Sequence, residues 1–186
     1  MLLNSKIVNK GWLLKPFNLL STSGNMVNEK DLFKSNGLVI TFICNHCPYV
    51  KDIISRIVKD FNDLQKLNVG IVAIMPNDTK SYPADSYENM LKFAKIHNFN
   101  FHYLYDQYQK TAEDYGAVCT PDFFCFDKNK KLFYRGRLDN LKFQSKNEKL
   151  RNKELLNAFK LKIEKDIIEN TQYSSMGCSI KWKKKT

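Results

Sequence analysis

Two uninterrupted apolar runs, residues 37–44 and 69–75, dominate the hydrophobic pattern of the chain. Both are rich in β-branched residues and lack polar alternation, so each predicts a central strand that is covered on both faces. Between them, apolar residues recur at spacings of three and four from Ile53 to Leu67, which is typical of an amphipathic helix. This order predicts a parallel pair of strands joined by a crossover helix.

The following segment predicts a second crossover of the same kind. Ser81 and Pro83 open its first helix, and Gly116 ends its last one. The predicted elements are, in chain order, a helix over 81–98, a short strand over 101–105 and a helix over 107–115.

A change in pattern then predicts an antiparallel hairpin, because two Phe-rich runs, 122–127 and 131–135, flank a short polar turn. Residues 138–150 are polar and predict a surface loop. A last helix is predicted over 151–169, with one apolar face: Leu155, Leu156, Phe159, Ile163 and Ile167. A weaker signal, Phe17 to Leu20 followed by a turn at 23–24, predicts a hairpin near the N-terminus.

These elements predict an α/β fold, with a mixed central sheet flanked by helices. A chain of 186 residues, 43% of them hydrophobic, suits one sizeable core. We therefore expect a single domain over residues 1–170, with an N-terminal extension, and a C-terminal tail over 171–186 that packs on the domain.

The net charge of +11, from 30 Lys and Arg against 19 Asp and Glu, raises the question of nucleic-acid or acidic membrane partners. The basic residues are spread over every predicted helix and loop, and only the run 181–185 resembles a patch, so we expect neither partner.

The longest clean apolar stretch is far shorter than the ~20 residues of a membrane-spanning helix. Asn and Lys interrupt the N-terminal apolar residues, unlike a signal peptide. We expect a cytoplasmic protein.

Five cysteines, an odd number, are an unlikely disulfide framework in a reducing compartment. The motif Cys44-Asn45-His46-Cys47 stands where a predicted buried strand ends and a helix begins. Free N–H groups and the helix dipole are expected to stabilise a thiolate on Cys44. Cys47 can then attack the mixed disulfide and release the substrate. Pro48 suits the first helical turn, where an N–H is not needed.

Two alternatives concern the same motif. His46, if oriented toward Cys44, would favour the thiolate and make the pair more oxidising; a solvated imidazole is the other interpretation. Zinc is the second alternative, with competent ligands in Cys44, His46, Cys47 and either Cys119 or Cys178. Structural zinc sites usually contain two close ligand pairs, and the sequence has one. We therefore expect no metal and no organic cofactor.

Thr120-Pro121 begins the first hairpin strand, where proline is tolerated. A cis bond there would bend the chain sharply and leave the Thr120 backbone free to pair with an extended substrate. An ordinary trans bond fits the sequence equally well.

The arrangement of these motifs over residues 11–170 resembles the thioredoxin-like superfamily. It resembles more narrowly the redoxin branch, which includes the alkyl hydroperoxide reductase and thiol-specific antioxidant proteins. The segments that carry the resemblance are 44–50, 115–124, 134–136 and 177–183. The resemblance implies a thioredoxin fold and a cis bond before Pro121, packed against the cysteine pair. It also implies that Cys44 is the attacking thiol and Cys47 the resolving thiol.

Two activities compete within that branch. Thr41 and Cys44 match the end of the peroxiredoxin pattern P-x-x-x-T-x-x-C, in which the hydroxyl and a distant arginine orient the peroxide. Gly37 replaces the proline of that pattern, and residues 120–122 contain no arginine where peroxiredoxins place theirs. Two arginines of the next strand are candidate replacements, Arg135 and Arg137. The sequence favours disulfide exchange over peroxide reduction.

The remaining cysteines have weaker predictions. Cys125 alternates with phenylalanines in a core strand and is expected to be structural. Cys119 and Cys178 are candidates for a third redox thiol, with buried packing as the alternative for Cys119 and a merely covering tail as the alternative for Cys178.

We therefore expect a thiol-disulfide oxidoreductase that acts on a protein or small-molecule disulfide and is served by an external thiol reductant. A thiol peroxidase is the second hypothesis. A non-enzymatic metal-binding or scaffold module is the third.

Overall fold

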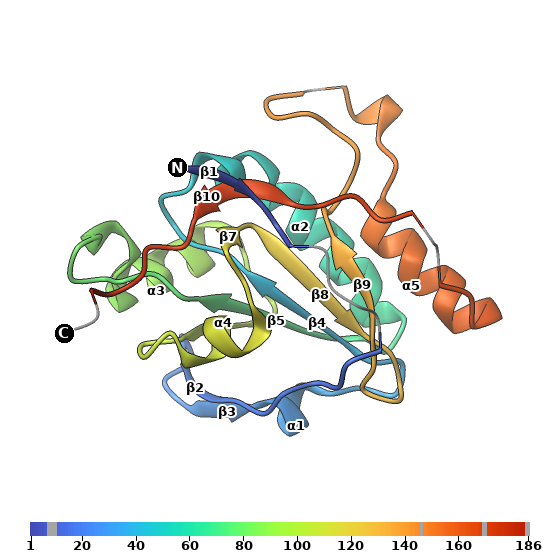
Figure 1. Ribbon diagram of the computed structural model, residues 1–186, viewed down its shortest axis with the longest axis horizontal. Helices are drawn as coiled ribbons and strands as arrows, with labels where there is room; N and C mark the ends of the chain where they lie inside the picture. Colours follow the sequence, from blue (N-terminus) through green and yellow to red (C-terminus); the bar gives the residue numbers. More distant parts are fainter. Residues whose placement is uncertain (7–10, 146, 169–170, 185–186) are drawn as a thin grey trace.

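The computed structural model describes residues 1–6, 11–145, 147–168 and 171–184, and its centre is a seven-stranded mixed sheet in the order β3-β2-β6-β5-β4-β8-β9 (Figure 1). The two middle strands β4 (Leu38–Phe42) and β5 (Gly70–Met75) are parallel and buried along their whole length. The amphipathic helix α2 (Pro48–Lys66) connects them. The predicted strand, helix, strand unit is confirmed.

The other elements of the large sheet and of the helices around it include those that the sequence predicted. In chain order they are β2 (Asn18–Ser21), β3 (Met26–Asn28), α1 (Glu29–Leu32), the 3-10 turn η1 (Pro83–Asp85), α3 (Tyr87–Ile96), β6 (His102–Tyr105), α4 (Lys110–Tyr115), β8 (Asp122–Phe126) and β9 (Leu132–Gly136). β6 is parallel to β5, whereas β8 and β9 form the antiparallel hairpin. The weakly signalled hairpin β2–β3 is confirmed, and α1 was not predicted.

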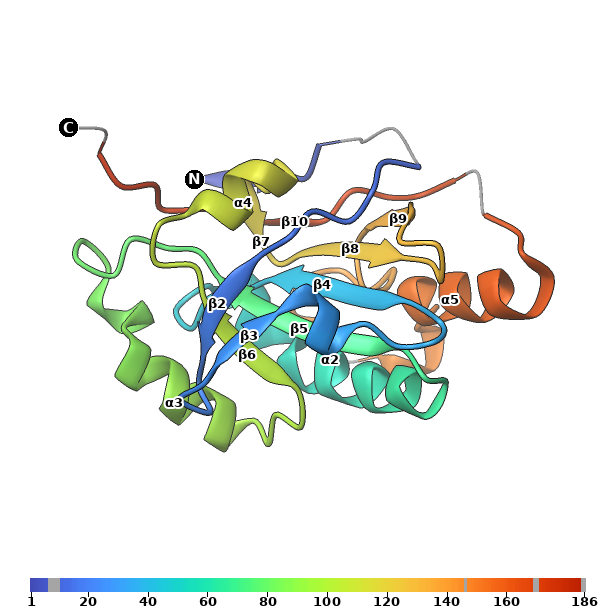
Figure 2. The same cartoon turned by 90° about the horizontal axis from the view of Figure 1, so that it is seen from below.

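Helices cover both faces of the sheet (Figure 2). α2, α3 and α5 (Glu154–Lys165) pack on one face, and their apolar side chains form the larger core cluster with those of the sheet. On the other face α4 packs with Phe17, Tyr115 and Ile180 in a second cluster. This layered arrangement matches the α/β fold with a mixed central sheet that the sequence predicted.

A second, three-stranded sheet joins the two ends of the chain to the start of the hairpin. β10 (Met176–Ser179) lies between β1 (Leu2–Asn4) and β7 (Cys119–Thr120), antiparallel to both (Figure 1). None of these three strands was predicted. Their consequence is that the C-terminal tail runs directly beside the residue that precedes Pro121.

The last helix is shorter than predicted. α5 ends at Lys165 because Asp166 adopts a left-handed conformation with φ of 53°. The predicted apolar face includes Ile163 and Ile167, but Ile163 is 37% exposed in the last turns of α5, and Ile167 is 49% exposed because it lies beyond the end of the helix. Position 169, where the predicted helix ends, lies outside the described residues. Among the described residues of the predicted surface loop, the short turn η2 (Glu148–Leu150) is the one regular element.

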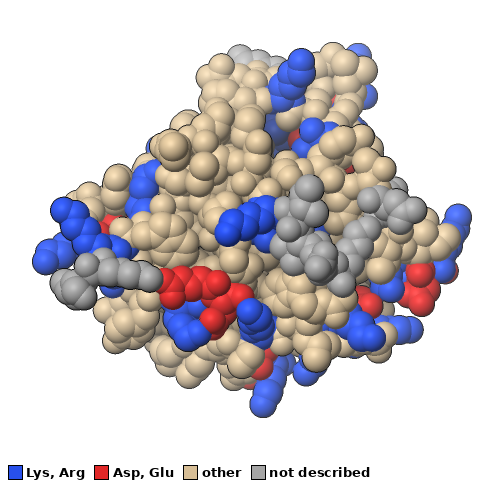
Figure 3. Space-filling view, viewed as in Figure 1, with Lys and Arg blue, Asp and Glu red and all other residues tan. Residues whose placement is uncertain are grey.

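Charged side chains are scattered over the surface. On the face drawn in Figure 3, Lys and Arg are spread widely, with Asp and Glu among them. Lys185 of the basic run lies outside the described residues. In the part of the chain that the structure describes, no helix combines the length and the apolar character needed to cross a membrane.

Candidate active site

Cys44 and Cys47 meet the cis peptide bond between Thr120 and Pro121. Cys44 lies two residues after the end of β4, and Cys47 is the N-cap of α2, followed by Pro48 at the first helical position. The Sγ atom of Cys44 is 3.3 Å from Oγ1 of Thr120, and that of Cys47 is 3.2 Å from the Thr120 carbonyl oxygen. The predicted redox pair therefore packs against a cis proline, and both thiols are fully buried.

Asp85 fixes the backbone between the two cysteines. Its Oδ1 accepts hydrogen bonds from the N–H groups of Asn45 at 2.8 Å and His46 at 3.2 Å. Its Oδ2 lies 2.6 Å from Nδ1 of His46 and accepts a bond of 2.8 Å from the Asn77 amide. The side chain of Asp85 has no exposed surface. A buried carboxylate thus accepts the N–H groups of the two residues between the cysteines.

Asp85 is ionised despite its burial. Burial alone would raise its pKa, but hydrogen bonds from His46 and Asn77, with that of the Asn45 N–H, hold the pKa below the ordinary carboxyl value. The imidazole of His46 stacks on the ring of Tyr82 at 5.7 Å. His46 therefore binds the carboxylate through Nδ1, and among the described contacts it makes no hydrogen bond to Cys44.

The two thiols differ in acidity. The hydrogen bond with Cys47, burial and the negative charge of Asp85 raise the pKa of Cys44 well above the ordinary thiol value. A hydrogen bond from Cys44 is the largest of several causes that lower the pKa of Cys47 to about 5. In the reduced protein the interaction between the two thiols favours the thiolate on Cys47, and the stabilised thiolate on Cys44 stays a prediction.

Cys178 supplies part of the stabilisation at Cys47. Its thiol and its backbone N–H both lower the pKa of Cys47, and the N–H of Val50 acts in the same direction. Together with the interaction with Cys44, they outweigh the burial of Cys47. Burial and the hydrogen bond with Cys47 in turn raise the pKa of Cys178 to about 11.

The backbone of Thr120 is not free for a substrate. Cys178 pairs with Thr120, and Ser179 pairs with Cys119, in the register of β10 and β7. A Cβ atom on Gly177 would lie 2.0 Å from the carbonyl oxygen of Thr120, which shows how closely the two backbones approach. The tail thus occupies the edge that the sequence analysis left open for an extended substrate.

The other two cysteines are buried away from these hydrogen bonds. Cys125 lies on β8 with no exposed surface, in the core position expected of it. Cys119 is also buried, and its Sγ lies 3.8 Å from the Pro121 carbonyl oxygen. Burial, with a contribution from Asp122, raises the pKa of Cys119. Neither thiol is poised for reaction in the reduced protein.

Three side chains at the site are competent metal ligands. One ligand atom each of Cys44, His46 and Asp85 lies within 4.8 Å of the others. The imidazole and the carboxylate already bind each other at 2.6 Å, and the remaining carboxylate lone pairs receive N–H donors. The set therefore favours an internal hydrogen-bond network over a cation. It shares Cys44 and His46 with the ligands considered from the sequence, but its third member is Asp85.

The pattern of the AhpC/TSA family matches residues 11–135. The chain belongs to the AhpC/TSA family. Membership of this family, together with the thioredoxin fold, indicates a thiol-based oxidoreductase. No curated protein matches the chain.

Solved structures place this AhpC/TSA protein among thioredoxin-fold proteins. An uncharacterized conserved protein from Geobacillus kaustophilus is 38% identical, with a TM-score of 0.94 over 100% of this chain and 98% of the other. The thioredoxin domain of a thiol-disulfide oxidoreductase from Bacteroides vulgatus is 16% identical, with a TM-score of 0.62 over 83% and 97%. Peroxidoxin BcpB from Mycobacterium tuberculosis is 16% identical, with a TM-score of 0.56 over 67% and 82%. The last two likenesses concern the fold.

The residues that the peroxiredoxin pattern would require are engaged elsewhere in this AhpC/TSA protein. The hydroxyl of Thr41 donates to the Asp122 carbonyl oxygen at 3.1 Å. Arg135 donates to the carboxylate of Asp122 at 2.8 Å, and both side chains are almost fully buried. Arg137 binds Glu154 at 2.7 and 2.8 Å. In these contacts neither arginine reaches Cys44.

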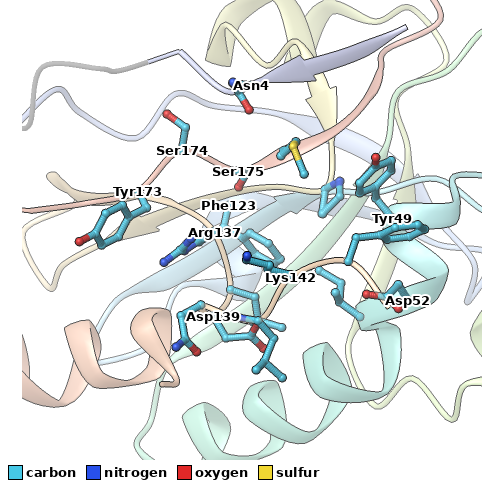
Figure 4. A pocket seen from close by; sticks show the side chains of 17 residues that line it. Asn4, Tyr49, Asp52, Phe123, Arg137, Asp139, Lys142, Tyr173, Ser174 and Ser175 are labelled. Carbon is cyan, nitrogen blue, oxygen red and sulfur yellow. The ribbon is translucent and has the colours of Figure 1, made fainter. Parts of the chain in front are cut away.

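A cavity of about 580 Å³ opens beside Pro121. Its walls come from α2, from the loop after β9 and from the segment that leads into β10 (Figure 4). The ring of Tyr49, two residues after Cys47, stacks on Phe143 at 4.4 Å at one side. At the other side the guanidinium of Arg137 lies 4.4 Å from the centre of the Tyr173 ring. The cavity thus adjoins the cis proline of this AhpC/TSA protein.

Sequence reasoning missed three residues of this site, Asp85, Asn77 and Tyr103. Asn77 also accepts the backbone N–H of Lys181 at 2.9 Å, and the Tyr103 hydroxyl donates to Asn45 Oδ1 at 3.0 Å. The only local signal was the turn around 76–78, which indicates a chain reversal but no partner. Asp85 binds groups 39 and 40 residues away, and no spacing rule reports such contacts.

Proposed function

We propose that this protein is a thiol-disulfide oxidoreductase that cycles Cys44 and Cys47 between dithiol and disulfide. The observation that carries the proposal is the contact of both sulfur atoms with Thr120, beside the cis bond to Pro121. Because both sulfur atoms lie against the same residue, the site favours a disulfide between them.

The exchange reaction balances in two steps. Cys44 Sγ attacks one sulfur of the substrate disulfide, whose S–S bond breaks; one half joins Cys44 and the other leaves as a thiol. Cys47 Sγ then attacks Cys44, which forms the Cys44–Cys47 disulfide and releases the second half. The substrate gains two electrons and two protons, and the protein loses them. An external thiol reductant restores the dithiol.

His46 is the group placed to take the proton of Cys44. One nitrogen of His46 and one oxygen of Asp85 lie within 4.8 Å of Cys44 Sγ. Of these three side chains only His46 reaches solvent, with 26% of its surface exposed. A substrate disulfide therefore approaches Cys44 past the imidazole, which is held by Asp85 and Tyr82.

The contacts favour exchange over peroxide reduction. A peroxidatic thiol is expected to have a hydroxyl and a guanidinium beside it, whereas Thr41 and Arg135 both bind Asp122. The hydroxyl beside Cys44 is that of Thr120, which precedes the cis proline. The proposed substrates are protein or small-molecule disulfides. Because an odd number of cysteines suits a reducing compartment, the cytoplasm is part of the proposal.

The test compares two oxidants. Reduced protein is incubated separately with insulin and with hydrogen peroxide, and thiol consumption is followed for wild type, Cys44→Ser and Cys47→Ser. Cys125→Ala is the matched control, since this thiol lies in the core of β8. We expect rapid reaction with insulin that Cys44→Ser abolishes and that Cys47→Ser stops at a mixed disulfide on Cys44, and slow reaction with peroxide.

Two other outcomes would contradict the proposed activity and favour another one. Rapid Cys44-dependent reaction with peroxide and slow reaction with insulin would make the protein a thiol peroxidase. Inertness toward both oxidants, with one zinc per chain lost in Cys44→Ser, would favour the metal-binding alternative at Cys44, His46 and Asp85.

A further inference from the structure

The C-terminal strand β10 closes the redox pair from one side. It pairs with β7 at Thr120, contacts the N-terminal part of the chain through β1 and packs against α2 (Figure 1). The close approach of Gly177 to the Thr120 carbonyl leaves no room for a substrate strand between them. With β10 in place, Cys44 and Cys47 are fully buried.

Cys178 is the thiol of β10 that meets this pair. It pairs with Thr120, whose carbonyl oxygen lies 3.2 Å from Cys47 Sγ, and it packs against the core cluster that contains Cys44 and Cys47. It is also the only one of the five cysteines with appreciable exposure. A single side chain therefore contacts the buried pair on its inner side and reaches solvent on its outer side.

We propose that Cys178 is a third redox thiol that carries the disulfide from the buried pair to the surface, where an external thiol reductant reacts with it. The inference rests on the proposed function, because it requires the Cys44–Cys47 disulfide as its starting point. It assigns a role to the tail strand itself: β10 holds Cys178 against Cys47 by its pairing with Thr120.

The relay proceeds by thiol-disulfide exchange. Cys178 Sγ attacks Cys47 Sγ; the Cys44–Cys47 bond breaks, a Cys47–Cys178 bond forms, and the electron pair leaves on Cys44, which takes the proton. An external thiol then attacks Cys178 and expels the Cys47 thiolate. A second external thiol resolves the mixed disulfide on Cys178. Two external thiols become one disulfide, and the protein regains its three thiols.

The charges around the three thiols suit these steps. In the reduced protein, the interaction with Cys47 is the largest cause of the raised pKa of Cys44. It is also one of the causes that raise the pKa of Cys178. That interaction is absent when Cys47 belongs to a disulfide. Lys181 and the N-terminal amine, which favour the Cys178 thiolate, remain. In the step that frees Cys47, its low pKa makes it a good leaving group.

The first test traps the intermediate. Cys44→Ser is oxidised with oxidised glutathione and digested without reduction, and its disulfides are mapped by mass spectrometry. We expect a Cys47–Cys178 link that is absent from Cys44→Ser/Cys178→Ser and retained in Cys44→Ser/Cys125→Ala. If Cys47 is instead recovered free or bound to glutathione, the relay is wrong.

The second test measures the path of the electrons. Wild type, Cys178→Ser and Cys125→Ala are oxidised to the Cys44–Cys47 disulfide, and its reduction by dithiothreitol is followed by acid quenching and alkylation. Serine keeps the size and backbone of position 178, so we expect it to slow reduction about tenfold by removing the exchanging sulfur alone. An equal or faster rate would show that β10 only shields the pair. If wild type forms no Cys44–Cys47 disulfide, the proposed function itself fails.

Discussion

The two sides of the Cys44–Cys47 motif differ in charge and in what covers them. On the Cys44 side lies the ionised Asp85, bound to His46 and to two backbone N–H groups. On the Cys47 side lie hydrogen-bond donors, from the start of α2 and from β10. Two thiols separated by two residues therefore have opposite pKa shifts. The start of a helix does not by itself determine which cysteine carries the thiolate. That depends on which groups accept hydrogen bonds from the N–H donors nearby.

The largest expected effect is the ionisation of Cys47. Its pKa of about 5 lies below the ordinary thiol value, so we expect one thiolate per protein at neutral pH. Absorbance at 240 nm, titrated from pH 8 to 4, is expected to show a step near pH 5 that Cys47→Ser removes. A step that persists in Cys47→Ser and disappears in Cys44→Ser would reverse the assignment of the two sides.

The same shift has a consequence for stability, with a definite sign. Because the pKa is depressed in the folded protein, the donors around Cys47 stabilise the fold fully above the unfolded thiol pKa, and this contribution is lost as pH falls through about 5. Denaturant unfolding at pH 7 and pH 4.5 is expected to show a larger loss for wild type than for Cys47→Ser.

A second prediction removes the cover from the Cys47 side. Gly177→Ala places a Cβ against the Thr120 carbonyl oxygen, so β10 is expected to separate from β7. Alkylation of Cys44 and Cys47 by iodoacetamide in the native protein should then rise about 100-fold, as for groups exposed by local opening. Met176→Ala is the control, because it shortens an exposed side chain of the same strand. An unchanged rate in Gly177→Ala would mean that β10 does not limit access.

The sequence revealed the large sheet more completely than the small one. β4 and β5 are buried on both faces, so their apolar runs were visible without any tertiary information. β1, β7 and β10 contain three, two and four residues, too few to show a period, and each exists because it pairs with residues far along the chain. The candidate site divides in the same way. Its local motif was found, whereas Asp85 and the closing of Thr120 by β10 depend on long-range contacts.

The third prediction concerns the Cys44 side. Asp85→Asn removes the negative charge that raises the pKa of Cys44 but keeps an oxygen for the N–H groups of Asn45 and His46. In a Cys47→Ser background, the substitution is expected to lower the pH midpoint of Cys44 alkylation and to raise the rate at pH 7 about threefold. Asp78→Asn is a matched control, since Asp78 binds Lys80 and Ser81 in the same segment. A higher midpoint in Asp85→Asn would contradict the electrostatic role.

The smallest expected effects come from substituting two buried threonines, Thr120 and Thr41. Of the two, only Thr120 contacts a redox sulfur. Its hydroxyl lowers the pKa of Cys44, so Thr120→Val is expected to slow thiol exchange about threefold at neutral pH. Thr41→Val leaves the Asp122 carbonyl without that donor and should cost about 1 kcal/mol of unfolding free energy, because a buried hydrogen bond is lost. Its exchange rate should equal that of wild type. A slower exchange rate in Thr41→Val, with an unchanged rate in Thr120→Val, would contradict this assignment. It would indicate that Thr41, as in the peroxiredoxin pattern, is the threonine that acts on Cys44.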